Sequence, residues 1–372
     1  MLMFEDGSMF EFTINFIEEN VAAISFPVHM ASSITALNST FMQSQACVWH
    51  RTKSLHVVQG EFARCALTDV RVIGSTDATT CLIAVAVDAA SPHLTASVCH
   101  FDEATVHIEN RITNLVAGMT APYLYLVGAT PHRPSHRCHP SASVATTAKL
   151  LETLHYEITT PIIVKLFCVL KWNGDASNNG APLFQSLALS LSLFPGMGGH
   201  IGNVRALHVP PGPQGWPDRG PLLHARLAQG CFAEEHRLLK LERKMSMSSH
   251  ECVGLSEDSI YDEIEECMCF RLFLGSALPR HVLDQIQSVA ELRDDHEFLQ
   301  RVSTTPEHEL SHVVDDIRGS YRWILDTERD RQVCENEVGG DARGNRSLQG
   351  MYKKMEEKKF VFSKTGWVEM GC

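Results

Sequence analysis

Short apolar runs recur through the first half of the chain, and their length is typical of buried β-strands. Polar residues, Gly and Pro separate these runs and mark turns. The pattern predicts strands over residues 55–63, 70–74, 81–87, 94–101, 123–129, 162–170 and 182–193. Two other stretches repeat their apolar side chains every three or four residues, which predicts amphipathic helices over 104–119 and 144–158.

The second half of the chain has a more polar pattern. Residues 195–221 are rich in Gly and Pro, which favours a long surface loop. Residues 221–325 are strongly charged and mostly helical in periodicity, and residues 351–368 fit a strand pair. Strands dominate the first half and helices the second, so we predict an α+β fold.

The composition supports a folded chain with an acidic surface. Hydrophobic residues make up 44% of the 372 residues, which is enough for a large core and argues against extensive disorder. The 32 Lys and Arg against 44 Asp and Glu give a net charge of −12. Such a surface repels a phosphate backbone, so we expect no nucleic-acid partner, whereas a cationic ligand such as a free amino terminus is easier to accommodate.

Targeting and membrane signals are weak in this sequence. The N-terminal stretch carries Glu5 and Asp6 and no cationic run, so it does not resemble a secretory signal. The most apolar stretches, 158–172 and 181–194, are too short to span a bilayer. We therefore expect a cytoplasmic or nuclear protein with no membrane partner. There the 12 cysteines are expected to be thiols, nucleophiles or metal ligands rather than disulfides.

The pairing of Cys81 with His100 is the sharpest chemical feature. Cys81 opens an apolar strand directly after a polar loop, and His100 lies near the end of the next strand. A symmetric hairpin turn between Ala90 and Ser91 would place the two residues directly opposite each other, with Cβ atoms about 4.5–5.5 Å apart. An imidazole at that distance can take the thiol proton and hold a thiolate. The alternative is an inert, buried cysteine beside an unrelated histidine.

The loop before Cys81 offers groups that suit such chemistry. Thr79, Thr80 and the Cys81 amide can donate hydrogen bonds to a developing oxyanion. Asp77 has two interpretations of similar weight. Its carboxylate either shapes the loop by bonding to nearby backbone, or it binds a cation.

Two more acidic residues lie close to this pair in the sequence. Asp102 is interpreted as the N-cap of the following helix, with orientation of His100 as the alternative. Glu61 is expected on the solvent side of its strand, with the holding of a substrate ammonium group as the alternative. The sequence does not identify the group that orients His100, because a backbone carbonyl could accept its hydrogen bond as well as Asp102.

Other motifs point less clearly to chemistry. Residues 131–140 (PHRPSHRCHP) hold metal-ligand types at His132, His136, Cys138 and His139. The segment also has two arginines and three prolines and lacks a second cluster at zinc-like spacing, so we expect a solvated loop. Cys267 and Cys269 are a weaker hint, and the Gly-rich residues 196–202 are not followed by the helix that a phosphate loop requires. We predict no bound metal.

The block Gly74–Cys81 (GSTDATTC), followed by an apolar strand and Cys99–Asp102 (CHFD), resembles the protein N-terminal asparagine amidohydrolase family. These enzymes deamidate an amino-terminal Asn to Asp. Similar blocks follow in the same order: HVVQGEFA, YLVGA, IIVKLFCVL, APLFQSLALSL, PDRGP, FLQRVSTTPE, HVVDDIR, MYKK and GW, with HVVQGEFA upstream of the cysteine. The similar blocks extend from about residue 50 to residue 370.

The resemblance implies a role for each member of the pair. Cys81 would be the nucleophile and His100 its acid-base partner, with no cofactor. The fold would be similar to that of bacterial deamidating toxins, with a mixed β-sheet core, helices packed outside it and a Cys-His pair. The partners would be proteins or peptides with a free N-terminal Asn, together with other components of N-degron-dependent protein degradation, because an N-terminal Asp can be arginylated.

The chain departs from the family pattern around His100. Gly60 stands where the family tends to have a basic residue, and Cys99 and Phe101 flank His100 differently. These departures bear on substrate preference and regulation more than on the chemistry.

The resemblance also sets the expected domain boundaries. We expect residues 1–50 to form an N-terminal helix and loop segment. Residues 51–330 would form the catalytic domain, with insertions near 195–216 and 229–278. Residues 331–372 would belong to that same domain.

Two other function classes share these features. A different cysteine hydrolase, such as a protease, a glutamine deamidase or a transglutaminase-like enzyme, would use the Cys81–His100 pair on another bond. A non-catalytic module would keep the fold in order to bind amino termini. Ammonia release with an intact peptide backbone distinguishes deamidation from other cleavage, and selective labelling of the Cys81 thiol distinguishes an enzyme from a binding module.

Overall fold

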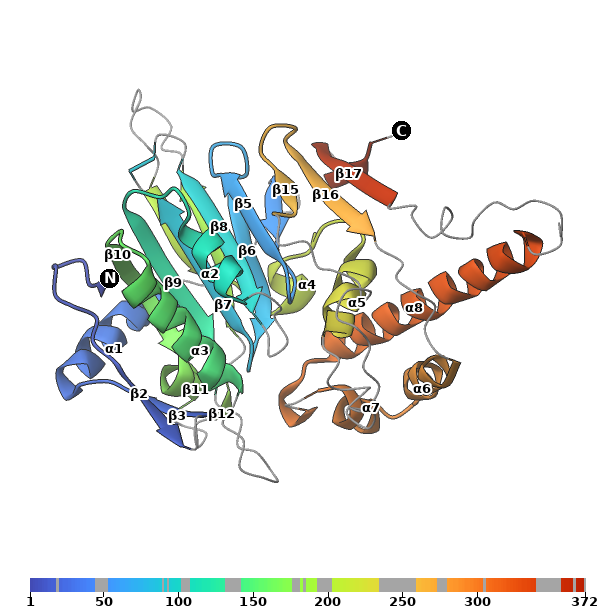
Figure 1. Cartoon of the computed structure of the whole chain (residues 1–372), viewed down its shortest axis with the longest axis horizontal. Coiled ribbons are helices and arrows are strands. Elements are labelled where there is room, and N and C mark those ends of the chain that lie inside the picture. The colour runs from blue at the N-terminus through green and yellow to red at the C-terminus, as the bar shows by residue number, and fades with distance from the viewer. Residues whose placement is uncertain are drawn as a thin grey trace. The chain divides into compact units, whose positions relative to one another are not determined.

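The computed structural model describes residues 1–17, 20–43, 53–88, 90–91, 94–101, 108–130, 142–175, 181–182, 185–192, 203–233, 259–272, 280–303, 306–338, 356–363 and 366–370 (Figure 1). The chain divides into two compact units. The first contains Met1–Gly220, Glu257–Met268 and Val361–Val368, and the second contains Pro221–Ser256, Cys269–Phe360 and Glu369–Cys372. The boundary after Gly220 falls inside the region 51–330 that the sequence analysis treats as one domain.

A six-stranded mixed sheet forms the centre of the first unit. Its strands, in spatial order, are β1 (Leu2–Met3), β10 (Ile162–Val169), β9 (Pro122–Gly128), β7 (Leu82–Asp88), β8 (Thr95–Phe101) and β5 (Phe62–Ala66). Strand β7 pairs antiparallel with both β8 and β9, whereas β9, β10 and β1 run parallel to one another. The apolar runs predicted as buried strands therefore gather in one sheet, and the predicted hairpin of β7 and β8 is confirmed.

A second sheet and a set of helices cover opposite faces of this sheet (Figure 1). The four-stranded sheet has the order β14 (Asn203–His208), β13 (Gln185–Ser192), β6 (Val72–Ala78) and β4 (Ser54–His56). Helices α1 (Val28–Gln43), α2 (Ile108–Val116) and α3 (Ala142–Glu152) contribute to the core on the other face. Along β7, Leu82, Ala84 and Ala86 point into that helical core. The mixed α+β class is confirmed.

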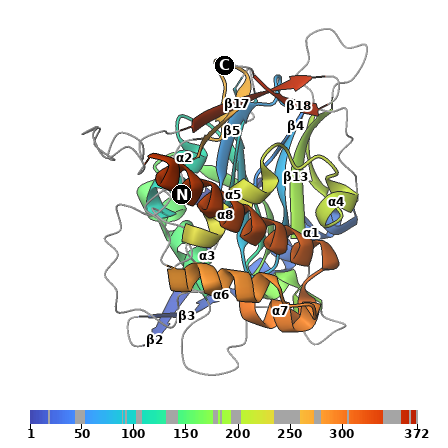
Figure 2. The same cartoon turned by 90° about the vertical axis from the view of Figure 1, so that its right-hand side faces the viewer.

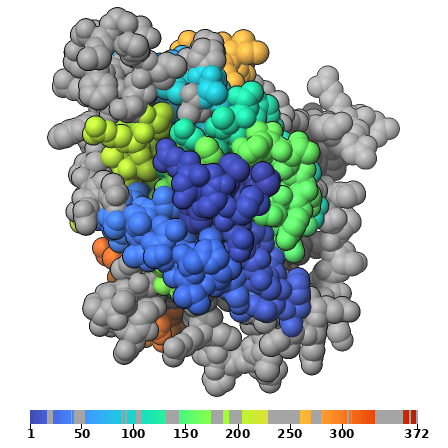
Figure 3. All heavy atoms as spheres, turned by 90° about the vertical axis from the view of Figure 1, so that its left-hand side faces the viewer, coloured from blue at the N-terminus to red at the C-terminus, as the bar shows by residue number. Residues whose placement is uncertain are grey.

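The N-terminal residues pack on the six-stranded sheet through aromatic side chains. Strands β2 (Thr13–Ile17) and β3 (Asn20–Ser25) form a hairpin ahead of α1. The Phe10 ring lies 5.0 Å from that of Phe167, and Phe26 lies 4.9 Å from Trp172. Figure 3 shows this segment as a continuous blue surface. The expectation of helix and loop misses β1, β2 and β3, because these strands are short and their apolar pattern is weak.

Three expectations about strands and loops are corrected by the structure. The predicted strand 55–63 is two strands, β4 and β5, because the chain turns at Gly60, where φ is 80°, and crosses from one sheet to the other. The predicted loop 74–80 is strand β6 up to Ala78, because its small polar residues are buried and find partners there: Ser75 bonds to His100 and Thr76 to His56. The predicted surface loop 195–221 includes β14, which pairs with β13, and the buried Trp216.

The remaining elements of the chain are short or lie near its end. They are η1 (Thr153–Glu157), η2 (Leu170–Asn173), β11 (Gly174–Asp175), β12 (Ala181–Pro182), α4 (Gly212–Gly215), β15 (Tyr261–Asp262), β16 (Cys267–Leu272), η4 (Pro306–His308), β17 (Glu356–Ser363) and β18 (Gly366–Glu369). The strand pair predicted over 351–368 corresponds to β17 and β18.

Helices dominate the second unit (Figure 2). They are α5 (Leu223–Ala233), α6 (Arg280–Ala290), α7 (Asp295–Val302) and α8 (Ser311–Val338). Their apolar faces meet in a core that includes Ile286, Phe298 and Tyr321. The helical pattern predicted for 221–325 is confirmed over α5, α6, α7 and the first half of α8, but residues 261–262 and 267–272 form strands β15 and β16. None of the described helices combines the length and the apolar character needed to cross a membrane.

Candidate active site

The connection from β6 to β7 carries Cys81 from one sheet to the other. Only Thr79, Thr80 and Cys81 separate the two strands, and both threonine side chains are buried. The Cys81 carbonyl accepts a hydrogen bond from the Ala129 amide at 2.6 Å, which continues the pairing of β7 with β9 by one residue. The Thr79 carbonyl accepts from the Thr130 amide at 2.8 Å. The half-buried Cys81 thiol therefore projects from a backbone that is fixed on one side.

Gly128 makes this fixed position possible. Its φ of 96° is rarely adopted by residues with a side chain, and a Cβ built there would lie 2.2 Å from the Cys81 carbonyl oxygen. The close approach lets the end of β9 bond to the loop before β7. This close approach is the structural reason for a glycine at position 128 of the YLVGA block.

His100 lies on the same face of the sheet as Cys81, but not directly opposite it. Strand β8 places His100 opposite Ile83, two residues after Cys81. The predicted register is wrong because Val87 pairs with Ala96, which moves the midpoint of the hairpin one residue past the expected position between Ala90 and Ser91. Asp88 remains in β7, and its carboxylate accepts from the Ala90 amide at 3.1 Å. Side chains two residues apart share a face, so Cys81 and His100 are diagonal neighbours, for which about 7–8 Å is typical.

Ser75 orients the imidazole of His100. The Ser75 Oγ lies 2.8 Å from His100 Nδ1, and the same hydroxyl donates to the Val57 carbonyl. A serine hydroxyl has one hydrogen to donate, so Ser75 must accept the hydrogen on Nδ1. This leaves His100 Nε2 unprotonated, and Nε2 is buried without a hydrogen-bond partner among the described residues. Nε2 is therefore the atom available as a base.

The environment keeps His100 neutral. Burial lowers the pKa of His100 from 6.5 to about 4, and the negative charge of Asp77 opposes this shift only in part. At neutral pH the imidazole is thus in its basic form, which can accept a proton but does not hold one in the resting state.

Asp77 shapes the end of β6. Its φ is 66°, a left-handed conformation in which Asp is better tolerated than most residues. One carboxylate oxygen accepts from the Gly212 amide at 2.9 Å, and the other accepts from the Thr76 hydroxyl at 2.8 Å. Its own amide donates to the Ser186 hydroxyl at 3.1 Å. These bonds support the loop-shaping interpretation, and they place a negative charge close to His100.

Glu61 is buried, with 4% of its surface exposed, so the expectation of a solvent-side residue is wrong. The turn at Gly60 folds the chain inward, and the Glu61 carboxylate accepts from the Val58 amide at 2.9 Å. The backbone of this turn also pairs with His100: the His100 amide donates to the Glu61 carbonyl at 3.1 Å, and the Gly60 amide donates to the His100 carbonyl at 2.9 Å.

Arg111 of α2 holds the same turn from the helical side. Its side chain is 2% exposed, and its Nη1 donates to the Gly60 carbonyl. The segment that supplies the Val57 carbonyl to Ser75 and the Glu61 carbonyl to His100 is therefore anchored from both layers. The sequence analysis missed Ser75 and Arg111, because Ser75 was included in a loop and Arg111 has the periodicity of an ordinary helix residue.

Other candidates lie outside the described residues or in a different place. Asp102 and the segment 131–140, with its three histidines, fall outside the described residues. Among the described residues, metal-ligand types gather along β16, where the ligand atoms of Glu265, Cys267 and Cys269 all lie within 4.8 Å of one another. The Cys267 thiol donates to Glu265 Oε2 at 3.8 Å.

Comparison with known proteins agrees with this geometry. A search of curated protein sequences gave no match. The sequence model of the protein N-terminal asparagine amidohydrolase family matches residues 44–192, which include Ser75, Cys81 and His100. The family consists of hydrolases that act on an amide C–N bond, so the enzyme class inferred from the resemblance is confirmed. Residues 44–192 of this chain are thus similar to the protein N-terminal asparagine amidohydrolase family.

Proposed function

We propose that this protein converts an N-terminal asparagine of a protein or peptide to aspartate, with Cys81 as nucleophile and His100 as acid and base. The observation that carries the proposal is the hydrogen-bond arrangement of His100. Ser75 takes the Nδ1 hydrogen, and the basic Nε2 lies on the face that also carries Cys81. A nucleophile next to a base that is itself oriented by a third group is the usual pattern of covalent catalysis.

The first half of the reaction forms a thioester. The Cys81 sulfur attacks the side-chain amide carbon of the substrate while His100 Nε2 takes the thiol proton. Because the pKa of His100 is lowered to about 4, the proton moves during the attack rather than beforehand. The imidazolium then gives this proton to the amide nitrogen, and the C–N bond breaks to release ammonia.

The second half restores the enzyme. Nε2 removes a proton from water, and the resulting hydroxide attacks the thioester carbonyl. The C–S bond breaks, the substrate side chain leaves as a carboxylic acid, and the proton on His100 returns to the sulfur. In both halves a negative charge develops on the carbonyl oxygen. We assign its stabilisation to the Cys81 amide and the hydroxyls of Thr79 and Thr80.

Selectivity for a chain terminus requires recognition of the α-ammonium group. Glu61 and Asp77 supply negative charge near His100, so one of them is our candidate for this contact; Asp102 is the third acidic candidate from the sequence. A buried carboxylate left without its cation is unfavourable, so a substrate that lacks the charge is rejected strongly.

The proposed product begins with Asp, which can serve as a secondary destabilising residue in N-degron-dependent degradation. This role, a cytoplasmic or nuclear location, and catalysis without a cofactor complete the proposal. The wider similarity to deamidating-toxin-like cysteine hydrolases belongs to it as well. This similarity is supported by the layered arrangement of the first unit. Helices cover one face of the central sheet, the second sheet covers the other face, and the Cys-His pair lies between the two sheets.

The test is mass spectrometry of peptides with N-terminal Asn, Gln or acetyl-Asn, together with ammonia detection. The expected result is a gain of about one mass unit on the Asn peptide only, with the peptide backbone intact. Backbone cleavage would indicate a protease, and a preference for Gln would change the substrate. Equal rates on the acetylated peptide would leave a general amidase instead of a terminus-specific enzyme.

A further inference from the structure

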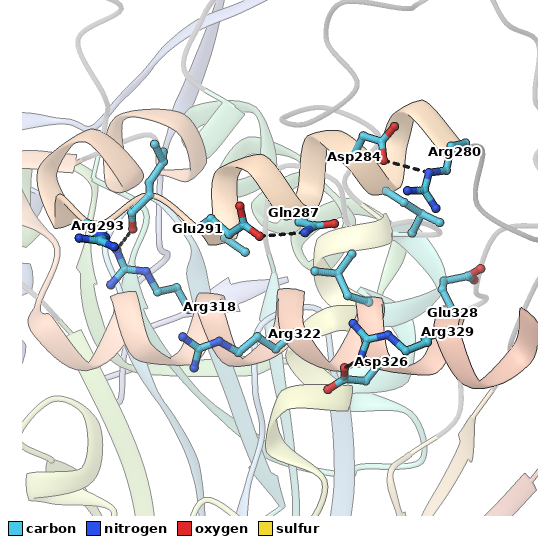
Figure 4. Close-up of a pocket in the computed structure, with 14 residues that line it drawn as sticks. Arg280, Asp284, Gln287, Glu291, Arg293, Arg318, Arg322, Asp326, Glu328 and Arg329 are labelled. Atoms are coloured by element: carbon cyan, nitrogen blue, oxygen red, sulfur yellow. Dashed lines mark hydrogen bonds and ion pairs between the residues drawn. The ribbon is translucent and has the colours of Figure 1, made fainter. Parts of the chain in front are cut away.

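A polar groove runs between helices α6 and α8 of the second unit (Figure 4). Its volume is about 730 Å³, within the range of about 300–1,000 Å³ that is typical of ligand pockets. Charged side chains dominate the lining: five arginines and four carboxylates are among its fourteen residues. The way these charges are paired determines what the groove can bind.

The carboxylates of the groove already have partners. Within the lining the pairs are Arg280 with Asp284 at 3.0 Å, Arg329 with Asp326 at 3.1 Å, and Gln287 with Glu291 at 2.8 Å. The fourth carboxylate, Glu328, is buried and also engaged. Arginines of the groove therefore balance Asp284 and Asp326, whereas Glu291 is bonded to a neutral amide.

Arg318 is held in place at one end of the groove. Its Nη1 donates to Asp295 at 2.7 Å, and its Nη2 donates to the Leu292 carbonyl at 2.7 Å. The guanidinium also lies over the Phe298 ring, 4.6 Å from its centroid. A guanidinium has five N–H donors, so donors remain for a ligand after these bonds are made.

Two more arginines share that end. Arg322 lies one turn after Arg318 on α8, and Arg293 follows α6 on the opposite side of the groove (Figure 4). Neither has an ion-pair partner among the described residues, and both are exposed. Like charges four residues apart on a helix repel each other, and the Asp295 carboxylate relieves this repulsion only on the side of Arg318. Asp295 balances the charge of Arg318, so the positive charge that lacks a partner at this end comes from Arg293 and Arg322.

We propose that this groove binds an acidic peptide segment of another protein, with carboxylates placed against Arg293, Arg318 and Arg322. Guanidinium groups bind carboxylates through two parallel hydrogen bonds, and clusters of arginines recognise acidic motifs in this way. An extended peptide fits an elongated groove between two helices.

The opposite end of the groove limits the choice of ligand. Asp284, Asp326 and Glu328 lie there, and Arg280 and Arg329 pair with the two aspartates. Among the residues described there, this end offers no unpaired arginine, so a long polyanion such as nucleic acid would find no binding partner along it. An acidic segment that continues into neutral or basic residues matches the whole groove. Binding of this kind is independent of the proposed catalytic function.

The experiment measures the fluorescence anisotropy of a labelled peptide with three or four consecutive Asp or Glu residues followed by neutral residues. The full-length protein should bind it, and added salt should weaken binding. A peptide with Lys at the acidic positions should not bind. The double variant R293Q/R322Q should bind at least about tenfold more weakly, which corresponds to one lost charge-assisted contact. The control R301Q changes an exposed arginine of α7 outside the groove and should bind as the unchanged protein does.

Several results would overturn the proposal. These are equal binding of the Lys peptide, unchanged affinity of R293Q/R322Q, or an equal loss in R301Q. Displacement of the acidic peptide by a short single-stranded oligonucleotide, or binding of a phosphopeptide without binding of the acidic one, would assign the groove to a different anion. The comparison of the acidic and Lys peptides uses only the unchanged protein, so it does not depend on the folding of any variant.

Discussion

The Cys81–His100 site and the α6–α8 groove use charged and polar residues in opposite ways. Around His100 the polar groups are buried and bonded mainly to backbone, so the imidazole is neutral and its tautomer is defined by Ser75. In the groove the arginines and carboxylates are mostly exposed, and several of them pair with each other. Burial of His100 leaves one reactive nitrogen in one protonation state, whereas the exposed side chains of the groove are accessible to a charged ligand from solution.

The largest expected effect comes from replacing the nucleophile. Cys81→Ser should lower turnover by at least about 10³-fold, because a hydroxyl is a far weaker nucleophile than a thiol beside a neutral imidazole. Ammonia release and a thermal melt should be measured on the same sample. An active serine variant would remove Cys81 from the mechanism, and an unchanged melt is needed to exclude loss of packing.

His100→Ala should slow the chemical step by roughly 10²–10⁴-fold, the usual contribution of a positioned acid-base group. The second measurement is the rate of Cys81 alkylation as a function of pH in both proteins. Coupled residues should give different curves. If the two curves coincide, the diagonal placement of Cys81 and His100 has no chemical meaning and the buried site resembles ordinary core.

Stability should depend on pH through His100. Its pKa is about 4 in the folded state and 6.5 in the unfolded state, so the unfolded chain binds more protons between these values. The folded state therefore loses stability as the pH falls from about 6.5 to 4, by roughly 3 kcal/mol in total from this group. Urea unfolding at pH 7, 5.5 and 4.5 checks this. His100→Gln should flatten the profile, and an equally steep profile in that variant would assign the effect to other groups.

Ser75→Ala should give the smallest of these changes, a fall in kcat of about tenfold with little change in KM, because the imidazole loses the acceptor that selects its tautomer. Ser75→Thr should restore part of the activity. Ser97→Ala is the matched control: Ser97 is also buried, on β8, and its hydroxyl has no hydrogen-bond partner among the described residues. Similar kcat values for the two Ala variants would contradict the positioning role of Ser75.

The sequence predicted which residues form the strands of the site more accurately than the register in which those strands pair. Apolar runs identify β7, β8 and β9 because buried strands leave a continuous hydrophobic signal. The register of β7 on β8 depends on where the turn begins. The Asp88 carboxylate bonds to the Ala90, Thr120 and Ala121 amides. Contacts between Asp88 and the residues before β9 are not visible in a local pattern, so the prediction was wrong by two residues.

Ser75 and Glu61 show a second limit. Both are polar, and polar residues are predicted on the surface unless a partner is known. Their partners are the Val57 carbonyl and the Val58 amide, which are backbone groups that carry no sequence signal. The family resemblance identified Cys81 and His100, but the residue that orients His100 was identified only from the three-dimensional contacts.

The contact between Gly128 and the Cys81 carbonyl restricts the amino acids that position 128 can accept. Even alanine would bring a methyl carbon to 2.2 Å from a backbone oxygen, and no rotation of a side chain relieves that overlap. In a library with every amino acid at each position of residues 125–129, position 128 should yield active clones only with glycine. Its neighbours should accept several apolar residues. A position that contributes no catalytic side chain would then be as intolerant of substitution as the nucleophile itself.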